Sequence, residues 1–189
     1  MKKDRFVAFF DAIMAIIMTI AVLQFAQPKG VEWIDLKDLS FQVLVYGLSF
    51  FWLGMMWLNI HNLWHNVESI SRGVIWINIV MLFFSSMIPF LVIYVGQNPT
   101  ALVPQLLYGV DVICITICNH ISTERLIKHN PHLALEVKTL RHSIVLDLGI
   151  KVLGIIIGIA VYPPAIMISV FIALIILIVN YLLMKKKKN

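Results

Sequence analysis

Residues 5–23 read RFVAFFDAIMAIIMTIAVL, an apolar run long enough to cross a lipid bilayer as one helix. The run nevertheless begins with a basic residue, Arg5, and holds a carboxylate, Asp11. A charged side chain at membrane depth is costly unless it faces protein or water, so it marks a candidate functional site. The stretch therefore predicts a membrane helix around which the rest of the chain is organised.

The spacing of four residues marks one face of this predicted helix. They follow the i, i+3, i+4, i+7 rule, which places side chains on one side of a helix: Ile16, Thr19, Ile20 and Leu23. Such a stripe is expected where a helix lines an ion pore. It is also expected where a helix simply packs against another, and spacing alone does not separate the two.

The composition is that of a protein embedded in a membrane. The chain has 189 residues, of which 60% are hydrophobic and 13% charged, and its mean hydropathy is +0.91. Soluble domains carry about 25% charged residues. We therefore predict an all-α integral membrane protein, with one domain over residues 1–189 and no soluble domain. In this setting the net charge of +5 does not indicate nucleic-acid binding.

Runs of about 20 apolar residues predict six membrane-spanning helices. Their approximate ranges are 4–26, 41–65, 73–96, 100–122, 142–161 and 164–184. Pro89 lies inside the third and predicts a kink there. The outer loop 28–40 is expected to hold a short interfacial helix near Trp33, and residues 122–140 are expected to form the longest inner loop.

The basic residues set the expected orientation. With the N-terminus inside, most of the 15 Lys and Arg residues fall on the inner side, including the tail 185–188. This bias predicts that both termini are cytoplasmic, in a multi-pass protein of the cell membrane. Asp4 and Asp11 interrupt the N-terminal apolar run, which argues against a cleaved signal peptide.

Several polar residues come out at similar depth near the inner ends of the first three helices. At about 1.5 Å per residue, Arg5, Asp11, His61, His65 and Asn78 are expected to approach one another. Such a network would satisfy Asp11 and brace the first helix.

A metal site is the alternative use of the histidines. His61, His65 and Glu68 have metal-ligand spacing on one helix face, but no second cluster repeats it. Cys114 and Cys118 are better explained as small buried apolar residues. We therefore expect no resident metal, no cofactor and no enzymatic activity.

Three ionisable residues fall deeper in the membrane. Asp111 and Lys151 come out near the midplane, and Asp147 lies one helical turn before Lys151. Either acid would neutralise the lysine as a structural ion pair. The functional alternative is a proton relay, in a proton-linked secondary transporter that uses Asp111 or Asp11.

Residues 5–19, RFVAFFDAIMAIIMT, resemble the R-x-x-x-F-S-D…A-I-x-x-T signature of the transmembrane protein 175 family of cation channels. WLNIHNLWH at 57–65 and NIVMLFFSSMIPF at 78–90 support the resemblance. The similarity covers the first three predicted helices, and the last three match only in hydropathy.

The resemblance implies a homotetramer in which the first helix of each six-helix subunit lines a central pore. The family's constriction isoleucine falls on Ile16, and its further layers fall on Thr19, Ile20 and Leu23. No T-V-G-Y-G loop occurs, so a ring of carbonyl oxygens is not expected to select the ion. A narrow apolar ring should instead favour K⁺ modestly over Na⁺, because K⁺ sheds water more readily, and other monovalent cations should also pass.

The same resemblance places the signature Arg, Phe and Asp on Arg5, Phe9 and Asp11. The signature Ser is replaced by Phe10. This replacement removes a hydroxyl from the network that is expected to brace the first helix.

Overall fold

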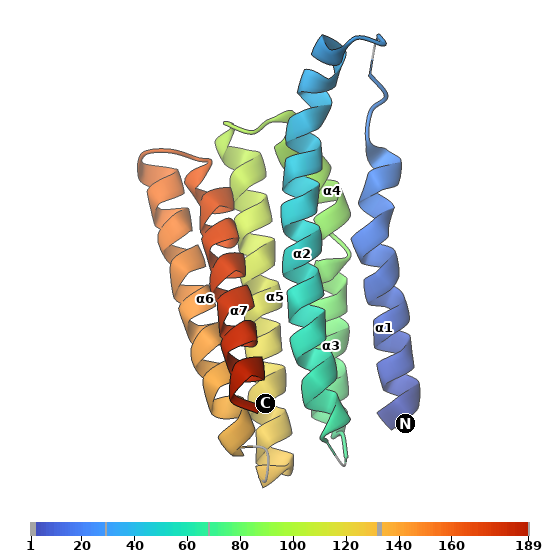
Figure 1. Ribbon diagram of the computed structural model, residues 1–189, viewed down its shortest axis with the longest axis vertical. Coiled ribbons are helices and arrows are strands. Elements are labelled where there is room, and N and C mark those ends of the chain that lie inside the picture. The colour runs from blue at the N-terminus through green and yellow to red at the C-terminus, as the bar shows by residue number, and fades with distance from the viewer. Residues whose placement is uncertain (1–2, 29, 68, 132–133, 189) are drawn as a thin grey trace.

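The computed structural model describes residues 3–28, 30–67, 69–131 and 134–188, and the described chain is almost entirely helical. The elements, in chain order, are α1 (Lys3–Ile20), η1 (Ala21–Gln24), η2 (Trp33–Leu36), α2 (Lys37–His65), α3 (Arg72–Ser85), α4 (Ile88–Gln97), α5 (Leu102–His129), α6 (Ala134–Ala160) and α7 (Ala165–Lys188). Figure 1 shows them as one layered bundle of roughly aligned helices, with α1 at one edge and α6 and α7 at the other.

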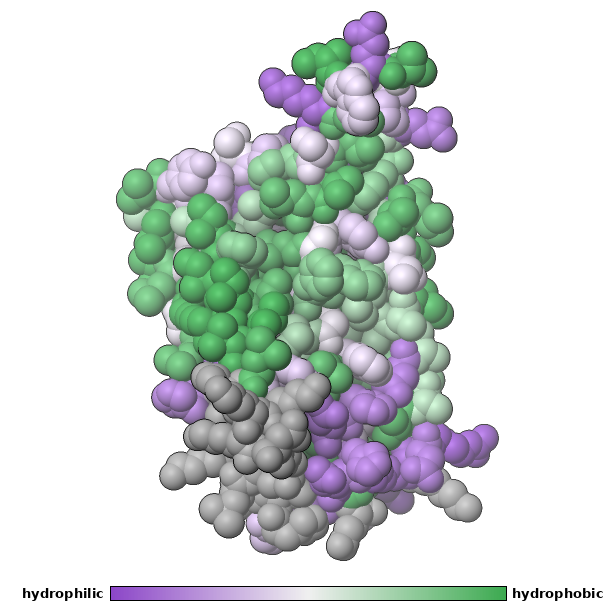
Figure 2. All heavy atoms as spheres, in the orientation of Figure 1, coloured by the Kyte–Doolittle hydropathy of each residue, from purple (hydrophilic) through white to green (hydrophobic). Residues whose placement is uncertain are grey.

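The predicted six-span architecture is confirmed. Six segments are long and apolar enough to cross a membrane: Lys3–Gln24, Trp33–His65, Arg72–Gln97, Leu102–His129, His142–Ala160 and Ala165–Leu182. Figure 2 shows the matching surface, with apolar residues over the middle of the molecule and hydrophilic residues gathered toward its two ends. The chain is therefore a multi-pass membrane protein.

The third span differs from the kinked helix that Pro89 predicted. The helix breaks earlier, at Ser86 and Met87, so that α3 and α4 are separate helices. Pro89 is the second residue of α4. Proline is well tolerated in the first turn of a helix, where its missing N–H has no intrahelical acceptor.

The prediction of a long inner loop over residues 122–140 was wrong. α5 continues to His129 and α6 begins at Ala134, so most of that segment is helical. Hydropathy shows where the apolar side chains end. The helix continues beyond that point because its backbone hydrogen bonds do not require apolar side chains. The expected short helix near Trp33 is confirmed as η2, which runs directly into α2.

Aromatic packing holds the N-terminal half of α1 against the bundle. The rings of Phe6 and Phe10 lie 5.4 and 5.0 Å from the ring of Trp64 on α2, measured between centroids. All three side chains are buried. Phe10, which stands where the resembled signature has Ser, is thus a core residue, and its contact with Trp64 is the T-shaped arrangement that aromatic pairs favour.

Glycines allow α6 and α7 to approach closely. A Cβ added at Gly158 would lie 2.5 Å from Cγ1 of Ile166, and one added at Gly154 would overlap the side chain of Ser169. Small residues spaced four apart are the usual means of close packing between membrane helices. The sequence GIIIG at 154–158 carried this signal.

Candidate functional site on the first helix

The two faces of α1 have different surroundings. Its buried face consists of large apolar side chains: Phe6, Phe10, Met14 and Ile17. The other face carries the α1 stripe, which we define as Ile16, Thr19, Ile20 and Leu23, and all four are exposed in the single chain. Ile16 is 60% exposed and Leu23 is 83% exposed. The described part of the chain thus leaves a row of bulky apolar residues uncovered along its edge helix.

Thr19 is the one polar member of the α1 stripe. Its hydroxyl lies 2.9 Å from the backbone oxygen of Ala15 and 3.3 Å from that of Ile16, and it donates back into its own helix. Because the proton is used in this way, the lone pairs of the hydroxyl oxygen are turned outward. The side chain therefore offers an acceptor to whatever occupies the space beside α1.

Arg5 and Phe9 lie on the same exposed side as the α1 stripe. No hydrogen bond or ion pair joins Arg5 to another described residue. The ring of Phe9 lies near that of Phe6 on the same helix, with 6.5 Å between the two centroids. In the described part of the chain, neither side chain makes a hydrogen bond or ion pair with Asp11, Trp57 or His61.

Asp11 is held by α2. The indole nitrogen of Trp57 donates to Oδ1 of Asp11 over 2.8 Å, and Nδ1 of His61 lies 3.9 Å from Oδ2. The rings of Trp57 and His61 are 5.2 Å apart, one helical turn from each other. Trp57 was missed as a partner of Asp11. Its place four residues before His61, within the motif at 57–65, was the signal that pointed to it.

The predicted network is only partly assembled. A groove between the N-terminal half of α1 and the C-terminal end of α2 is lined by Asp11, His61 and His65 together with Lys3 and Asp4. In the described part of the chain, no three His, Cys, Asp or Glu side chains are grouped so as to hold a metal ion. Glu68, which completed the metal-ligand spacing, lies outside the described residues.

Asn78 was wrongly predicted to join Asp11. Its side-chain nitrogen donates to the hydroxyl of Ser122 on α5 and to the backbone oxygen of Val74, both over 2.7 Å. The residue is fully buried between α3 and α5. Helical rise gives the depth of a residue correctly but not the direction in which its side chain points.

The structure decides which acid neutralises Lys151. Its ammonium lies 2.5 Å from Oδ2 of Asp147, and both side chains are buried. Asp111, the other candidate, is buried on α5, and its Oδ2 has no hydrogen-bond partner among the described residues.

Comparison with known proteins finds similarity over part of the chain. Residues 5–89 match the family of the endosomal/lysosomal potassium channel TMEM175. A potassium channel of Chryseobacterium sp. (strain P1-3) is 34% identical over 117 residues, which cover 62% of this chain and 61% of that one. A potassium channel of Streptomyces collinus is 25% identical over 124 residues, covering 61% and 60%. The matches thus span about three fifths of the length of these relatives.

The fold is similar over nearly the whole chain. The crystal structure of a lysosomal potassium-selective channel TMEM175 homolog from Chamaesiphon minutus superposes with a TM-score of 0.74, at 21% identity, over 96% of this chain and 97% of that one. The resemblance predicted from residues 5–19 is therefore confirmed: the chain is a multi-pass membrane protein with the TMEM175 family pattern in residues 5–89 and the fold of a solved TMEM175 homolog.

Proposed function

We propose that the chain is the subunit of a potassium-conducting cation channel, with α1 lining the pore. The observation that carries this proposal is the exposed α1 stripe, which no described element of its own chain covers. The potassium-channel names of the family and of the two relatives support it. A single α1 cannot enclose a water path, so the function requires several copies.

Four copies around an axis, with one α1 from each, form the proposed pore. The homotetramer follows from the family resemblance. The exposed α1 at one edge of the bundle supports it, because an edge helix is free to meet its symmetry mates (Figure 1). We place this assembly in the cell membrane with both termini cytoplasmic, as the distribution of basic residues predicts.

Ile16 forms the proposed constriction, with Ile20 and Leu23 as further apolar layers. A ring of four isoleucine side chains supplies no oxygen ligands, so an ion crosses it only by shedding part of its water. The preference for K⁺ over Na⁺ is then weak, and other monovalent cations also pass. A constriction of this kind closes by dewetting.

Thr19 provides the proposed polar layer beside the constriction. Its outward-facing oxygen is the kind of ligand that replaces part of the hydration shell of a cation. Four such oxygens, one turn from Ile16, would stabilise a partly dehydrated ion as it leaves the apolar ring.

The brace for this pore helix is the pair of contacts that Asp11 makes with Trp57 and His61. They fix the rotation of α1, and therefore which residues face the axis. Arg5 and Phe9 lie on the exposed side, so we assign them to the inner end of the pore surface rather than to the brace.

The decisive test is conduction by Ile16→Asn in planar bilayers. A wetter, wider ring should raise single-channel conductance and reduce the K⁺/Na⁺ permeability ratio toward one. Ile16→Val, which keeps the ring apolar, is the matched control and should retain the preference. Unchanged conductance and selectivity in Ile16→Asn would rule out Ile16 as the constriction, and a purified particle smaller than four 21.6 kDa chains would rule out the tetramer.

The second candidate is a proton-linked secondary transporter. The unpartnered buried oxygen of Asp111 favours it, because a membrane-buried carboxyl without a partner is a proton-carrying candidate. Asp11 is the weaker choice, since Trp57 already satisfies one of its oxygens. Flux into liposomes that requires a pH gradient, shows no unitary steps and is lost in Asp111→Asn would establish the transporter in place of the channel.

A further inference from the structure

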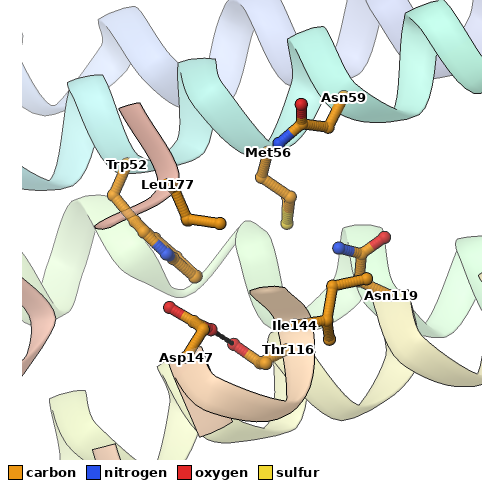
Figure 3. Close-up of a pocket in the computed structure, with 8 residues that line it drawn as sticks. All are labelled: Trp52, Met56, Asn59, Thr116, Asn119, Ile144, Asp147 and Leu177. Carbon is orange, nitrogen blue, oxygen red and sulfur yellow. Dashed lines mark hydrogen bonds between the residues drawn. The ribbon is translucent and has the colours of Figure 1, made fainter. Parts of the chain in front are cut away.

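A second polar site lies inside the subunit, away from α1. Figure 3 shows a small cavity between α2, α5, α6 and α7, to which Asp147 and Thr116 present oxygens and Asn59 and Asn119 present amides. The cavity volume is about 20 Å³. A water molecule requires roughly 10–15 Å³ and two or more polar partners, so the space and its lining suit one water.

One oxygen of Asp147 is fully engaged. Oδ2 lies 2.5 Å from the ammonium of Lys151 and 3.2 Å from the hydroxyl of Thr116. The same ammonium also donates to the Thr116 hydroxyl over 2.8 Å and lies 4.3 Å from the centre of the Trp52 ring. The lysine charge is therefore satisfied by a carboxylate, a hydroxyl and an aromatic face.

The other oxygen of Asp147 is not engaged. Oδ1 has no hydrogen-bond partner among the described residues, although the residue is only 4% exposed. In Figure 3 it is turned away from Thr116, on the side of the cavity where Trp52 lies. A carboxylate oxygen buried without a donor is costly, and such groups are normally satisfied by ordered water.

We propose that this cavity is a water-binding site, in which a water donates to Oδ1 of Asp147 and the amides of Asn119 and Asn59 complete the polar lining. A cation is disfavoured there because Lys151 already neutralises Asp147 at 2.5 Å. A larger ligand does not fit a cavity of about 20 Å³. Both asparagines are partly exposed, which gives the water a way in. The site is distinct from the proposed pore and does not depend on it.

A double-mutant cycle in the full-length purified protein tests the site. Asn119→Leu removes an amide from the cavity and fills it with an apolar side chain. Asn119→Leu should lower the melting temperature in the native background, because Oδ1 of Asp147 then loses its water molecule. In a background with Asp147→Leu and Lys151→Met it should have little effect, since no charge then needs solvating. Asn98→Leu, at an exposed position outside the cavity, is the matched control and should act equally in both backgrounds.

Two outcomes would overturn the proposal. An equal shift of Asn119→Leu in both backgrounds would show that the amide does not act through the ion pair. A melting temperature that rises with K⁺ or Na⁺ against N-methylglucamine at constant ionic strength, and loses that rise when the pair is replaced, would show that a cation occupies the site instead.

A density map of the native protein gives a second measurement if the charge-free background does not fold. At a resolution that shows ordered water, density is expected within hydrogen-bond distance of Oδ1 of Asp147. A map that shows waters elsewhere in the subunit but a dry cavity would also overturn the proposal.

Discussion

Trp57 of α2 donates its indole N–H to the carboxylate of Asp11 on α1, with 2.8 Å between Nε1 and Oδ1. Between helices in lipid the hydrophobic effect supplies little force, so directional polar contacts and close packing decide how helices are rotated. This bond joins the edge helix to α2, the same helix that makes the aromatic contact between Trp64 and Phe10. Together the two contacts determine which residues α1 leaves exposed.

Removing the indole N–H should therefore loosen α1. Trp57→Phe keeps an aromatic ring but leaves Asp11 without its donor. A hydrogen bond to a charged group contributes about 1.5–3 kcal/mol, and partial exposure of Asp11 puts the expected loss at the lower end of that range. The measurement is thermal unfolding in detergent, followed by intrinsic fluorescence.

Trp76→Phe is the control for this variant, because Trp76 is largely exposed on α3 and no hydrogen bond joins it to another described residue. It should unfold close to the native temperature. Equal destabilisation by the two substitutions would show that ring size, and not the bond to Asp11, is what matters.

The sequence predicted this helix well, because its information is local. The apolar run gave the span, and the 3.6-residue period gave the exposed face that holds Ile16 and Leu23. The partners of its polar residues were harder to predict. The position of a residue along a helix can be counted from the sequence, but the neighbouring helix that its side chain faces cannot. Asn78 was expected at the level of Asp11, yet it bonds to Ser122 on α5 instead.

Thr19 offers a selective test of the polar layer beside the constriction. Thr19→Val has nearly the same shape but no hydroxyl, so K⁺ would lose a replacement ligand as it leaves the ring. We expect lower K⁺ conductance, and a K⁺/Na⁺ permeability ratio that falls toward one, in bilayer recordings. Thr19→Ser keeps the hydroxyl and should keep the preference; a loss of preference in both variants would point to packing instead.

The ion pair of α6 should show opposite effects for single and double replacement. Lys151→Met leaves Asp147 as a buried unpaired charge, which typically costs about 3–5 kcal/mol. Replacing both residues with apolar ones of similar volume is expected to be near neutral. Chemical or thermal unfolding of the two variants measures the difference, and equal destabilisation would contradict the pairing.

The choice of partner for Lys151 is another point that the sequence left open. Asp111 and Asp147 both lay within reach by depth, and whether Asp111 reaches Lys151 depends on the packing of α5 against α6. Asp147 is one turn away on the same helix, so its position relative to Lys151 is fixed by α6 alone. The helix ends were missed for a different reason: residues 123–129 are mostly polar, and a fall in hydropathy does not mark the end of a helix.

Glycine substitutions on α6 should depend sharply on position. Gly154→Ala places a methyl group against Ser169, and overpacking of this kind costs about 1–3 kcal/mol. Gly149→Ala meets no atom within 4 Å and should stabilise the helix by up to about 1 kcal/mol through propensity. Melting temperatures of the two variants should move in opposite directions, and parallel shifts would argue against close packing of α6 on α7.

The short 3-10 turn η1 changes the geometry of the outer end of α1. Each of its residues rises about 2.0 Å instead of about 1.5 Å and turns by roughly 120° instead of roughly 100°. Leu23 is thus higher and further round the axis than an unbroken α-helix would place it. In a fourfold assembly, the Leu23 layer would therefore be rotated relative to the layers of Ile16 and Ile20. An ion crossing the proposed pore would meet two separate apolar constrictions and not one continuous apolar wall.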